Sequence, residues 1–283
     1  MNNDHLINKF IEFLKRKDRS KSTIVAYQAD IKQLSDISKK DISLLAQEDI
    51  KEFLKRLKEA EGLTPKTVSR KLNSIKTFYK FLILKDFVKD NPTKELHHPK
   101  FINAKPKFLN KEQYVKLKEA CKSNSKNFMM LELILQTGMR ISEVSNLRLE
   151  DIDLARSKPT ITIKINKEIN RVIPLNDKLF FELKDYMASL PKSVYLFTTK
   201  NNKPIEVRNI RAALDRVFQK VKLQQFCIND LRNTFIVCQL SNGIKLSALA
   251  KVVGHKSVTA TERYIDILPR KYKDRGIEVL TEL

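Results

Sequence analysis

Three side chains suited to chemistry on a phosphate diester follow one another near the C-terminal end of the sequence. Arg232 follows an Asp-Leu pair, His255 follows a glycine, and Tyr264 ends the segment Ala-Thr-Glu-Arg-Tyr. A tyrosine hydroxyl can attack phosphorus and keep the bond energy in a phosphate ester, which permits rejoining without ATP. A guanidinium holds two phosphate oxygens with its planar donors and stays charged at any working pH. The set therefore predicts cleavage of a phosphodiester by Tyr264, with a His or Lys protonating the leaving hydroxyl.

The motifs of other phosphate chemistries are missing from the sequence. It contains no glycine-rich phosphate loop, no His-Glu-x-x-His segment and no cluster of carboxylates of the kind that holds two metal ions. The adjacent His97 and His98 have no nearby cysteine and no ligand spacing. We therefore expect a reaction that uses no metal and no cofactor.

The charge of the chain indicates a polyanionic partner. Lys and Arg number 55 against 33 Asp and Glu, which gives a net charge of +22 and a pI near 9.8. Nucleic acid is the usual partner for such an excess, although a highly soluble basic protein is the plainer alternative. No apolar run approaches the roughly 18 residues that a membrane span needs. The three unpatterned cysteines and the lack of a signal peptide predict a protein of the reducing cytoplasm.

Residues 1–92 are predicted to form a bundle of helices. Apolar residues recur every three or four positions, as at Leu6 and Phe10, and Thr64-Pro65 is a helix start with Thr as N-cap. The helix after Pro65 carries many cations, a pattern that suits either a solvated face or contact with DNA phosphates. We expect DNA contacts from this helix and from the following linker at Lys66, Arg70, Lys71, Lys76, Lys80, Lys105 and Lys107.

Residues 93–107 are predicted to be a basic linker, because prolines occur in and beside this segment and apolar periodicity does not. A second domain, residues 108–283, begins at Asn110, an N-cap with Gln113 at the third helical position. One of its helices is expected to run from Met139 to Asn146.

Alternating residues at 160–165 and 171–175 predict strands of a small antiparallel sheet, separated by a polar turn around Lys167. Helices are expected again from Asp177 to the end of the chain. The predicted fold is mainly α: a two-domain DNA clamp with a helical bundle first and an α-rich domain with a small antiparallel sheet second.

At these residues the chain resembles the tyrosine recombinases, the family of phage integrases and Xer-like site-specific recombinases. The segment Thr-Gly-Met-Arg140-Ile-Ser-Glu143 matches the family's first arginine motif, and Leu-Arg232 matches the second. Gly-His255 and then Tyr264 follow at the family's spacing. One such motif is a weak signal, whereas four in order are a strong one, and the resemblance covers nearly the whole length.

The resemblance implies a role for each matching residue. Arg140 and Arg232 would bind the scissile phosphate, His255 would add a hydrogen bond, Tyr264 would be the nucleophile, and Glu143 would support Arg140. The family also has a hairpin lysine, the general acid for the departing 5′ hydroxyl. Counting back from the end of the hairpin places it at Lys167, in a turn one residue shorter than is common, with Lys164 as the alternative.

The sequence departs from the family at Asn229, where a histidine usually assists removal of the tyrosine proton. Asn233 likewise replaces a frequent histidine. Asparagine cannot accept a proton near neutral pH. An active enzyme with slower or differently assisted tyrosine activation is the favoured interpretation, because general-base help is worth about 10²–10⁴-fold and its loss slows a reaction without abolishing it. A binding-only relative and a misplaced alignment are the alternatives.

The resemblance further implies a SAM-like core-binding domain at 1–92, a catalytic domain at 108–283, and strand exchange through a 3′-phosphotyrosyl intermediate and a Holliday junction. Four protomers would assemble on two double-stranded DNA sites to resolve DNA dimers or cointegrates. A C-terminal helix would dock into a neighbouring protomer or pack within its own chain, through an apolar stripe at Ile277, Leu280 and Leu283.

Two other functional classes fit the same residues. A type IB-like topoisomerase would use the same chemistry without pairing two sites, and it would relax plasmids that lack any special site. A catalytically weak DNA-binding relative would form no covalent adduct, and Asn229 is its one support in the sequence.

Overall fold

The structure is a computed structural model of the chain that describes residues 2–155, 157–165 and 168–268. The chain divides into two compact units, Met1–Asn103 and Ala104–Leu283, and the division falls inside the segment predicted as a linker. Each unit has its own buried apolar core. Within the described residues, no helix has the length and apolar character needed to cross a membrane.

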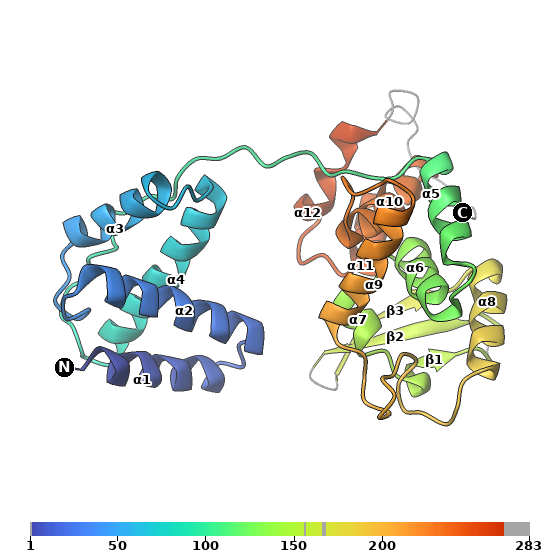
Figure 1. The fold of residues 1–283 in the computed structure, drawn as a ribbon, viewed down its shortest axis with the longest axis horizontal. Coiled ribbons are helices and arrows are strands. Elements are labelled where there is room, and N and C mark those ends of the chain that lie inside the picture. Colours follow the sequence, from blue (N-terminus) through green and yellow to red (C-terminus); the bar gives the residue numbers. More distant parts are fainter. Residues whose placement is uncertain (1, 156, 166–167, 269–283) are drawn as a thin grey trace. The chain divides into compact units, whose positions relative to one another are not determined.

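Unit 1 is a bundle of helices around a core of Leu, Ile and Phe side chains (Figure 1). Its helices are α1 (Asn3–Arg16), α2 (Lys21–Ser38), α3 (Gln47–Glu59) and α4 (Pro65–Leu84). Thr64 accepts a hydrogen bond from the Thr67 amide and Pro65 begins α4, as the sequence predicts. The Phe10, Phe78 and Phe81 rings pack against one another in the core, with Phe10 and Phe78 edge to face at 5.2 Å.

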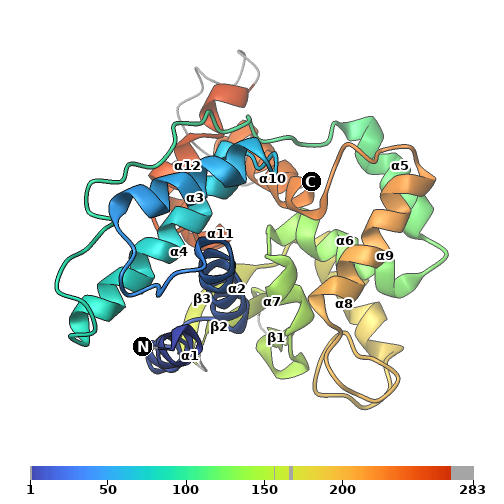
Figure 2. The same ribbon diagram turned by 60° about the vertical axis from the view of Figure 1, so that its left-hand side comes forward.

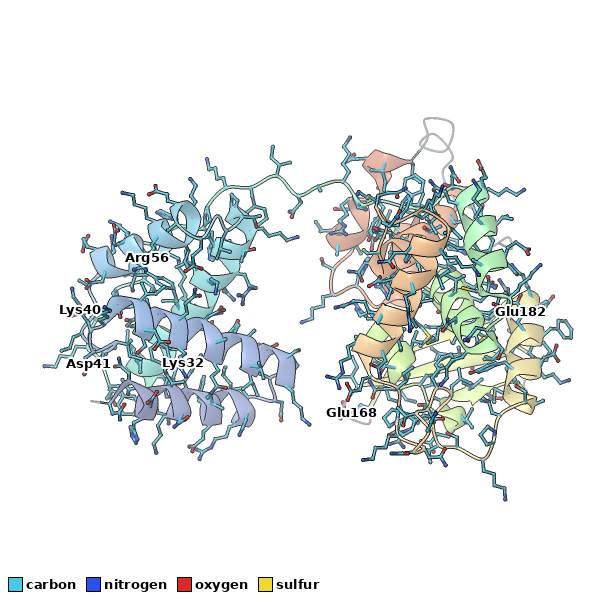
Figure 3. All side chains as sticks on the ribbon, viewed as in Figure 1. Lys32, Lys40, Asp41, Arg56, Glu168 and Glu182 are labelled. Atoms are coloured by element: carbon cyan, nitrogen blue, oxygen red, sulfur yellow. The ribbon has the colours of Figure 1, made fainter. Side chains whose placement is uncertain are left out.

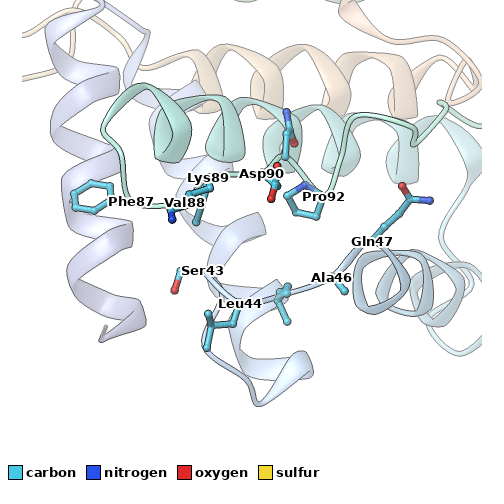
Figure 4. Close-up of a pocket in the computed structure, with 11 residues that line it drawn as sticks. Ser43, Leu44, Ala46, Gln47, Phe87, Val88, Lys89, Asp90 and Pro92 are labelled. Carbon is cyan, nitrogen blue, oxygen red and sulfur yellow. The ribbon is translucent and has the colours of Figure 1, made fainter.

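A pocket of about 500 Å³ in unit 1 lies between two connecting segments (Figure 4). One segment precedes and begins α3 at residues 43–47, and the other follows α4 at residues 87–92. The lining mixes backbone with small and apolar side chains, and Lys89 and Asp90 contribute one charge of each sign. The pocket has no cluster of cations and is separate from the residues predicted to do chemistry.

Unit 2 contains the remaining elements, and most of them are helices (Figure 1). In chain order these elements are α5 (Lys111–Cys121), α6 (Ser125–Thr137), α7 (Ile141–Ser145), the 3₁₀ turn Leu149–Asp151, β1 (Ile152–Asp153), β2 (Thr160–Ile165), β3 (Glu168–Pro174), α8 (Asp177–Ala188), α9 (Val207–Lys220), α10 (Ile228–Ser241), α11 (Leu246–Val253), α12 (Thr259–Glu262) and the 3₁₀ turn Ile265–Ile267. The N-cap Asn110 and Gln113 form the predicted capping box at the start of α5.

Helix α6 passes through the middle of unit 2 and contacts α5, α7, α8, α9 and α10 (Figures 1 and 2). Its residues are buried without interruption from Met129 to Thr137. Most of them are apolar, and the buried Glu132 and Gln136, one turn apart, hydrogen-bond to each other. The helix ends at Gly138, whose φ of 64° is left-handed. A Cβ at this position would lie 2.5 Å from the Phe235 ring, so glycine is required.

The sheet of unit 2 has three antiparallel strands in the order β1-β2-β3. Ile161 pairs with Ile152 on one side and Ile173 on the other, and a register shift occurs between Ile163 and Lys164. Glu168, labelled in Figure 3, begins β3 near the tip of the hairpin. The mainly helical fold with a small antiparallel sheet is therefore confirmed.

The helix predicted from Met139 to Asn146 is shorter than expected, because α7 comprises only Ile141–Ser145. The left-handed Gly138 and the extended backbone of Arg140 (φ −74°, ψ 147°) end one helix and begin the next in a tight turn. This turn separates a core helix from a short surface helix and presents Arg140 at its N-cap.

Candidate active site

Arg140 is placed by the turn between α6 and α7 and by Glu143. The Glu143 carboxylate accepts from the Arg140 backbone amide at 2.7 Å and from Arg140 Nη1 at 3.0 Å. The side chain of Arg140 is 42% exposed, whereas that of Glu143 is 12% exposed. The Glu143 carboxylate therefore fixes the Arg140 backbone and one side of its guanidinium, while the guanidinium stays accessible to a ligand.

Arg232 lies on the first turns of α10 and is buried. Its Nη1 donates to the Gly138 carbonyl oxygen, and its Nη2 donates to the Val253 carbonyl oxygen at 2.6 Å. One guanidinium thus bridges the turn that carries Arg140 and the end of α11. Arg140 and Arg232, which are 92 positions apart in the sequence (232 − 140), meet in one site.

The C-terminal end of α11 binds three arginines through three consecutive carbonyl oxygens. Arg171 Nε donates to Val252 O at 2.7 Å, Arg232 Nη2 to Val253 O at 2.6 Å, and Arg140 Nη2 to Gly254 O at 2.6 Å. Carbonyls at a helix end have no partner inside the helix and carry its partial negative charge. The end of α11 therefore fixes the three cations in a defined arrangement.

Gly254 allows this arrangement because it has no side chain. It ends α11 with a φ of 68°, and a Cβ there would lie 2.9 Å from Arg171 Nη1 and 3.2 Å from Arg140 Nη1. Any larger residue would both strain the backbone and push the guanidinium groups away.

The site is strongly electropositive. Burial lowers the pKa of Arg232 to about 10, and the neighbouring Arg140 cation acts in the same direction. Burial also lowers the pKa of His255 to about 4, with the Arg232 and Arg140 cations next in importance, so the imidazole is neutral at physiological pH. A bound anion would stabilise the positive charge gathered in this site, and a phosphate diester supplies such an anion.

Glu143 is the carboxylate that directly neutralises this cluster. Burial opposes its ionisation, but hydrogen bonds from Arg171 and from the Arg140 amide outweigh burial and lower the pKa of Glu143. Arg140, Arg171 and Arg232 surround it, so positive charge remains in excess of the one carboxylate. The excess can bind a singly charged phosphate diester.

His255 follows Gly254 and lies beside Tyr264. The imidazole Nδ1 is 2.7 Å from Thr261 Oγ1, and its ring stacks on the Tyr264 ring with centroids 6.4 Å apart and planes at 14°. Thr261 is fully buried. The short helix α12 therefore sets both the orientation of the imidazole and the position of the tyrosine that follows it.

Tyr264 is 3% exposed, and its hydroxyl donates to Asn233 Oδ1 at 2.7 Å. Arg263 Nη2 lies 3.3 Å from the same hydroxyl, with its guanidinium carbon 5.0 Å from the ring centre. Asn233 is itself held, because its Nδ2 donates to Lys107 O and to Asp230 Oδ1. The partner of the Tyr264 hydroxyl is thus an amide oxygen on α10.

The Tyr264 hydroxyl donates to Asn233, and no hydrogen bond joins it to Asn229 among the described residues. Asn229 is exposed on the first turn of α10, and its side chain makes no hydrogen bond to another residue among those described. The asparagine that meets the tyrosine is Asn233, one turn further along the same helix.

Of the two lysines that the sequence offers as the general acid, Lys167 lies outside the described residues. Lys164, on β2, forms an ion pair with Asp151 at 2.5 Å, and interaction with this carboxylate is the first cause of the raised pKa of Lys164. A groove of about 860 Å³ runs beside Arg140 and Gly254 and includes Lys164 and Lys256 in its lining.

The cations predicted to contact DNA on α4 are not equivalent. Arg70 binds Asp30 with two hydrogen bonds of 2.6 and 2.8 Å, and Lys71 binds the same carboxylate at 2.9 Å. Burial raises the pKa of Asp30, but Arg70, Ser74 and Lys71 outweigh it and the net pKa is lowered. Lys66, Lys80 and Lys105 are exposed, Lys76 is half-buried, and Lys107 is exposed with Nζ 3.1 Å from Gln225 O.

The sequence did not single out Arg171, Thr261 or Arg263 as site residues. The signal for Arg171 is its place in an alternating strand, where it shares the inward face with the buried Ile173. An arginine on the buried face of a strand requires a charged or polar partner. The apolar stripe of the expected C-terminal helix, at Ile277, Leu280 and Leu283, lies outside the described residues.

Family models match both parts of the chain. Residues 107–270 match the model of the Phage integrase family, and residues 6–88 match that of the phage integrase N-terminal SAM-like domain.

Several curated proteins are similar over almost the whole chain. A tyrosine recombinase of Pseudothermotoga lettingae is 28% identical over 294 residues, covering 99% of each chain. The tyrosine recombinase XerC of Oceanobacillus iheyensis is 30% identical over 280 residues, covering 92% of this chain and 91% of that protein. The tyrosine recombinase XerD of Staphylococcus aureus is 28% identical over 279 residues, covering 93% and 94%.

Solved structures share the fold. The XerH site-specific recombinase bound to palindromic difH substrate, in a post-cleavage complex, has a TM-score of 0.76 at 18% identity, covering 96% of this chain and 83% of that one. The Tn1549 transposon integrase in complex with a circular intermediate DNA has a TM-score of 0.74 at 21% identity, covering 93% and 94%.

Proposed function

The chain belongs to the phage integrase family of tyrosine recombinases, and on that premise we propose that it cuts and rejoins DNA at specific sites through Tyr264. As a member of this family it is a site-specific DNA recombinase. In the proposed reaction the Tyr264 hydroxyl oxygen attacks the scissile phosphorus, and the bond from phosphorus to the 5′ oxygen breaks. The products are a 3′-phosphotyrosyl ester and a free 5′ hydroxyl.

The observation that carries this proposal is the arginine cluster at the end of α11. Arg140 and Arg232 are fixed on successive carbonyls, and the cluster has more positive charge than Glu143 neutralises. Their donors would bind the non-bridging oxygens of the scissile phosphate and stabilise the charge that grows on them during attack. The neutral His255 would add a hydrogen bond from Nε2, with Thr261 holding Nδ1.

The proton steps involve Tyr264 at one end and a lysine at the other. The tyrosine proton must leave as the hydroxyl attacks, and neither Asn229 nor Asn233 can accept it as a base. The leaving 5′ oxygen needs a proton, for which we propose Lys167. The ion pair of Lys164 with Asp151 supports this choice, since it engages the alternative lysine with a carboxylate. Rejoining reverses the steps, with a 5′ hydroxyl of the partner strand attacking the phosphotyrosyl ester.

We propose a division of labour between the domains, which the matches to the two family models support. We assign residues 1–92 to core binding, 93–107 to the linker and 108–283 to catalysis. Duplex DNA would be held by both domains, with α4 and the linker supplying phosphate contacts. The Tn1549 transposon integrase was solved in complex with a circular intermediate DNA and XerH with its palindromic difH substrate, which supports DNA as the partner.

Strand exchange requires two DNA sites, so we propose a homotetramer on the paired sites. The strands would be exchanged in pairs, with a Holliday junction between the two rounds and the C-terminal helix exchanged between protomers. The relatives named XerC and XerD are bacterial proteins. We propose that this chain likewise acts in the bacterial cytoplasm, where it would resolve DNA dimers or cointegrates.

A covalent-trapping assay tests the proposed nucleophile. Selection from random duplexes with Tyr264→Phe protein first provides a binding site. A duplex with that site and a nick beside the scissile phosphate then releases a short fragment after cleavage, which traps the adduct. Wild-type protein should form a denaturation-resistant adduct without added metal or ATP, whereas Tyr264→Phe should bind the duplex equally well and form none. An adduct with Tyr264→Phe would refute the assignment.

A further inference from the structure

Arg171 is a buried arginine on the inward face of β3. Its side chain is 6% exposed, and its strand neighbours Val172 and Asn170 point outward. Buried arginines are rare because removing a guanidinium from water is costly unless every donor finds a partner. An apolar residue would suit this face of the strand, so the arginine at position 171 must serve a purpose that an apolar residue could not.

The donors of Arg171 join two segments that carry site residues. Nη1 and Nη2 donate to the two oxygens of Glu143 at 2.9 and 2.7 Å, and Nε donates to Val252 O at 2.7 Å. Glu143 in turn holds both the backbone amide and the guanidinium of Arg140. A continuous set of hydrogen bonds therefore runs from the end of α11 through Arg171 and Glu143 to Arg140.

Arg171 cannot act as a phosphate ligand in this arrangement. Its side chain is almost fully covered and its three nitrogens are engaged, whereas the side chain of Arg140 is 42% exposed. Arg171 does keep Glu143 ionised, since it is the first of the groups that lower the pKa of Glu143 against burial. An ionised and fixed Glu143 sets the direction of Arg140.

We propose that Arg171 is a positioning residue for DNA cleavage, which fixes Arg140 through Glu143 and fixes the Gly254 turn that precedes His255. The proposal rests on the proposed function. Without Arg171, Glu143 would have Arg140 as its remaining guanidinium partner and would draw it toward itself. The Arg140 guanidinium would then be displaced from the scissile phosphate oxygen, and a displacement of about 1 Å can slow a reaction about 10²-fold.

The test compares a charged and an uncharged scissile linkage. Arg171→Lys keeps the positive charge but loses the two-pronged contact with Glu143. On a phosphodiester suicide substrate at saturating DNA, this variant should cleave about 10- to 100-fold more slowly than wild type, with DNA affinity unchanged. On a substrate with a methylphosphonate at the scissile position, which has no charge for Arg140 to compensate, the loss should shrink to about threefold or less.

Tyr114→Phe is the matched control for lost stability. It removes a partly buried hydroxyl that donates to Glu132 at 3.1 Å, in the same unit but away from the arginine cluster. It should lower the melting temperature and change cleavage of both substrates by the same small factor. An equal loss on both substrates for Arg171→Lys, or a loss confined to DNA affinity, would overturn the proposal.

A second variant covers the case in which Arg171→Lys does not fold. The double variant Arg171→Gln/Glu143→Gln removes both charges of the buried pair and keeps polar groups in place. It should fold and show the same preferential loss on the phosphodiester, and wild-type cleavage of the phosphodiester by this variant would overturn the proposal. Failure of wild-type protein to form any adduct would instead count against the proposed function itself.

Discussion

The Tyr264 hydroxyl is the reacting atom in the proposed mechanism, and in this structure it donates to Asn233 Oδ1. An amide oxygen accepts the hydrogen bond without taking the proton. The tyrosine is also 3% exposed, so it must leave this contact to reach a phosphate held by Arg140 and Arg232. Asn229, which the sequence comparison with the family assigns to the histidine position, is exposed on the same helix, and the hydroxyl's hydrogen bond goes to Asn233 instead.

Replacing Asn229 with His adds a base at an exposed position, where its pKa should stay near the ordinary value of about 6.5. Only the neutral imidazole accepts a proton. Asn229→His should therefore cleave the suicide substrate about 10- to 100-fold faster than wild type at pH 8 and lose this advantage as the pH falls below about 6.

The control for this substitution is Asn229→Gln, which changes size without adding a base and should leave the rate within about twofold of wild type. Rates are measured as adduct formation against pH. Equal rates for Asn229→His and wild type at every pH would mean that another group already removes the tyrosine proton.

At the scale of residues, motif order predicted which side chains gather but not how each is held. Arg140, Arg232 and His255 do meet around Gly254 in the structure. The contacts of Arg171 with Glu143 and Val252 join segments that are distant in sequence, and such contacts depend on the fold. For the same reason, the sequence directed attention to Asn229 rather than to Asn233 as the neighbour of Tyr264.

The end of α11 is the element that organises the arginine cluster. Three successive carbonyls accept from three arginines, and the helix can end there because Gly254 adopts a φ of 68°. The arrangement depends on the space that a Cβ at Gly254 would fill.

Gly254→Ala should therefore lower the cleavage rate by at least about tenfold, because displaced guanidinium groups stabilise the transition state less well. Gly62→Ala is a matched control: Gly62 has a φ of 62° and no neighbouring atom within 4 Å of the position that a Cβ would take, so it shares the backbone strain without the collision. Gly62→Ala should lose about 1 kcal/mol of stability from the left-handed backbone alone, and Gly254→Ala at least as much, measured by denaturant unfolding. Equal cleavage by the two variants would contradict a role for the space at Gly254.

Helix α4 combines free cations with cations that serve the fold. Asp30 is buried and binds both Arg70 and Lys71, so part of the positive charge of α4 is compensated inside unit 1. Lys66 and Lys80 are exposed and make no ion pair with another residue in the described part of the chain. The charge pattern of the sequence identified the helix but could not separate these two groups, because Asp30 lies on α2.

The salt dependence of DNA binding distinguishes the two groups. If Lys66 contacts a phosphate, Lys66→Ala should reduce the slope of log Kd against log salt by about 0.9, with a similar change for Lys80→Ala. Lys71→Ala should reduce the slope by less than about half as much, because its Nζ is bound to Asp30 and Gln33. A fluorescence-anisotropy titration across salt concentrations measures the slopes, and equal reductions for Lys66→Ala and Lys71→Ala would be the contrary result.

At the scale of the whole molecule, two separately cored units share one strongly basic chain. The helices of both units follow from apolar periodicity, and β2 and the second part of β3 follow from alternation. The two-residue β1 and the start of β3 at Glu168, three residues before the predicted 171, do not. The boundaries of α7 did not follow, since the turn at Gly138 and Arg140 depends on packing against α10. From this architecture we expect both units to hold the DNA and unit 2 to cut it.

The most direct measurement of the central claim is the chemical identity of the trapped adduct. Wild-type adduct on the nicked substrate is digested with protease and nuclease, and the linked nucleotide is located by mass spectrometry. The account predicts a nucleotide joined through its 3′ phosphate to the phenolic oxygen of Tyr264. Linkage through a 5′ phosphate, or attachment to a residue other than Tyr264, would contradict it.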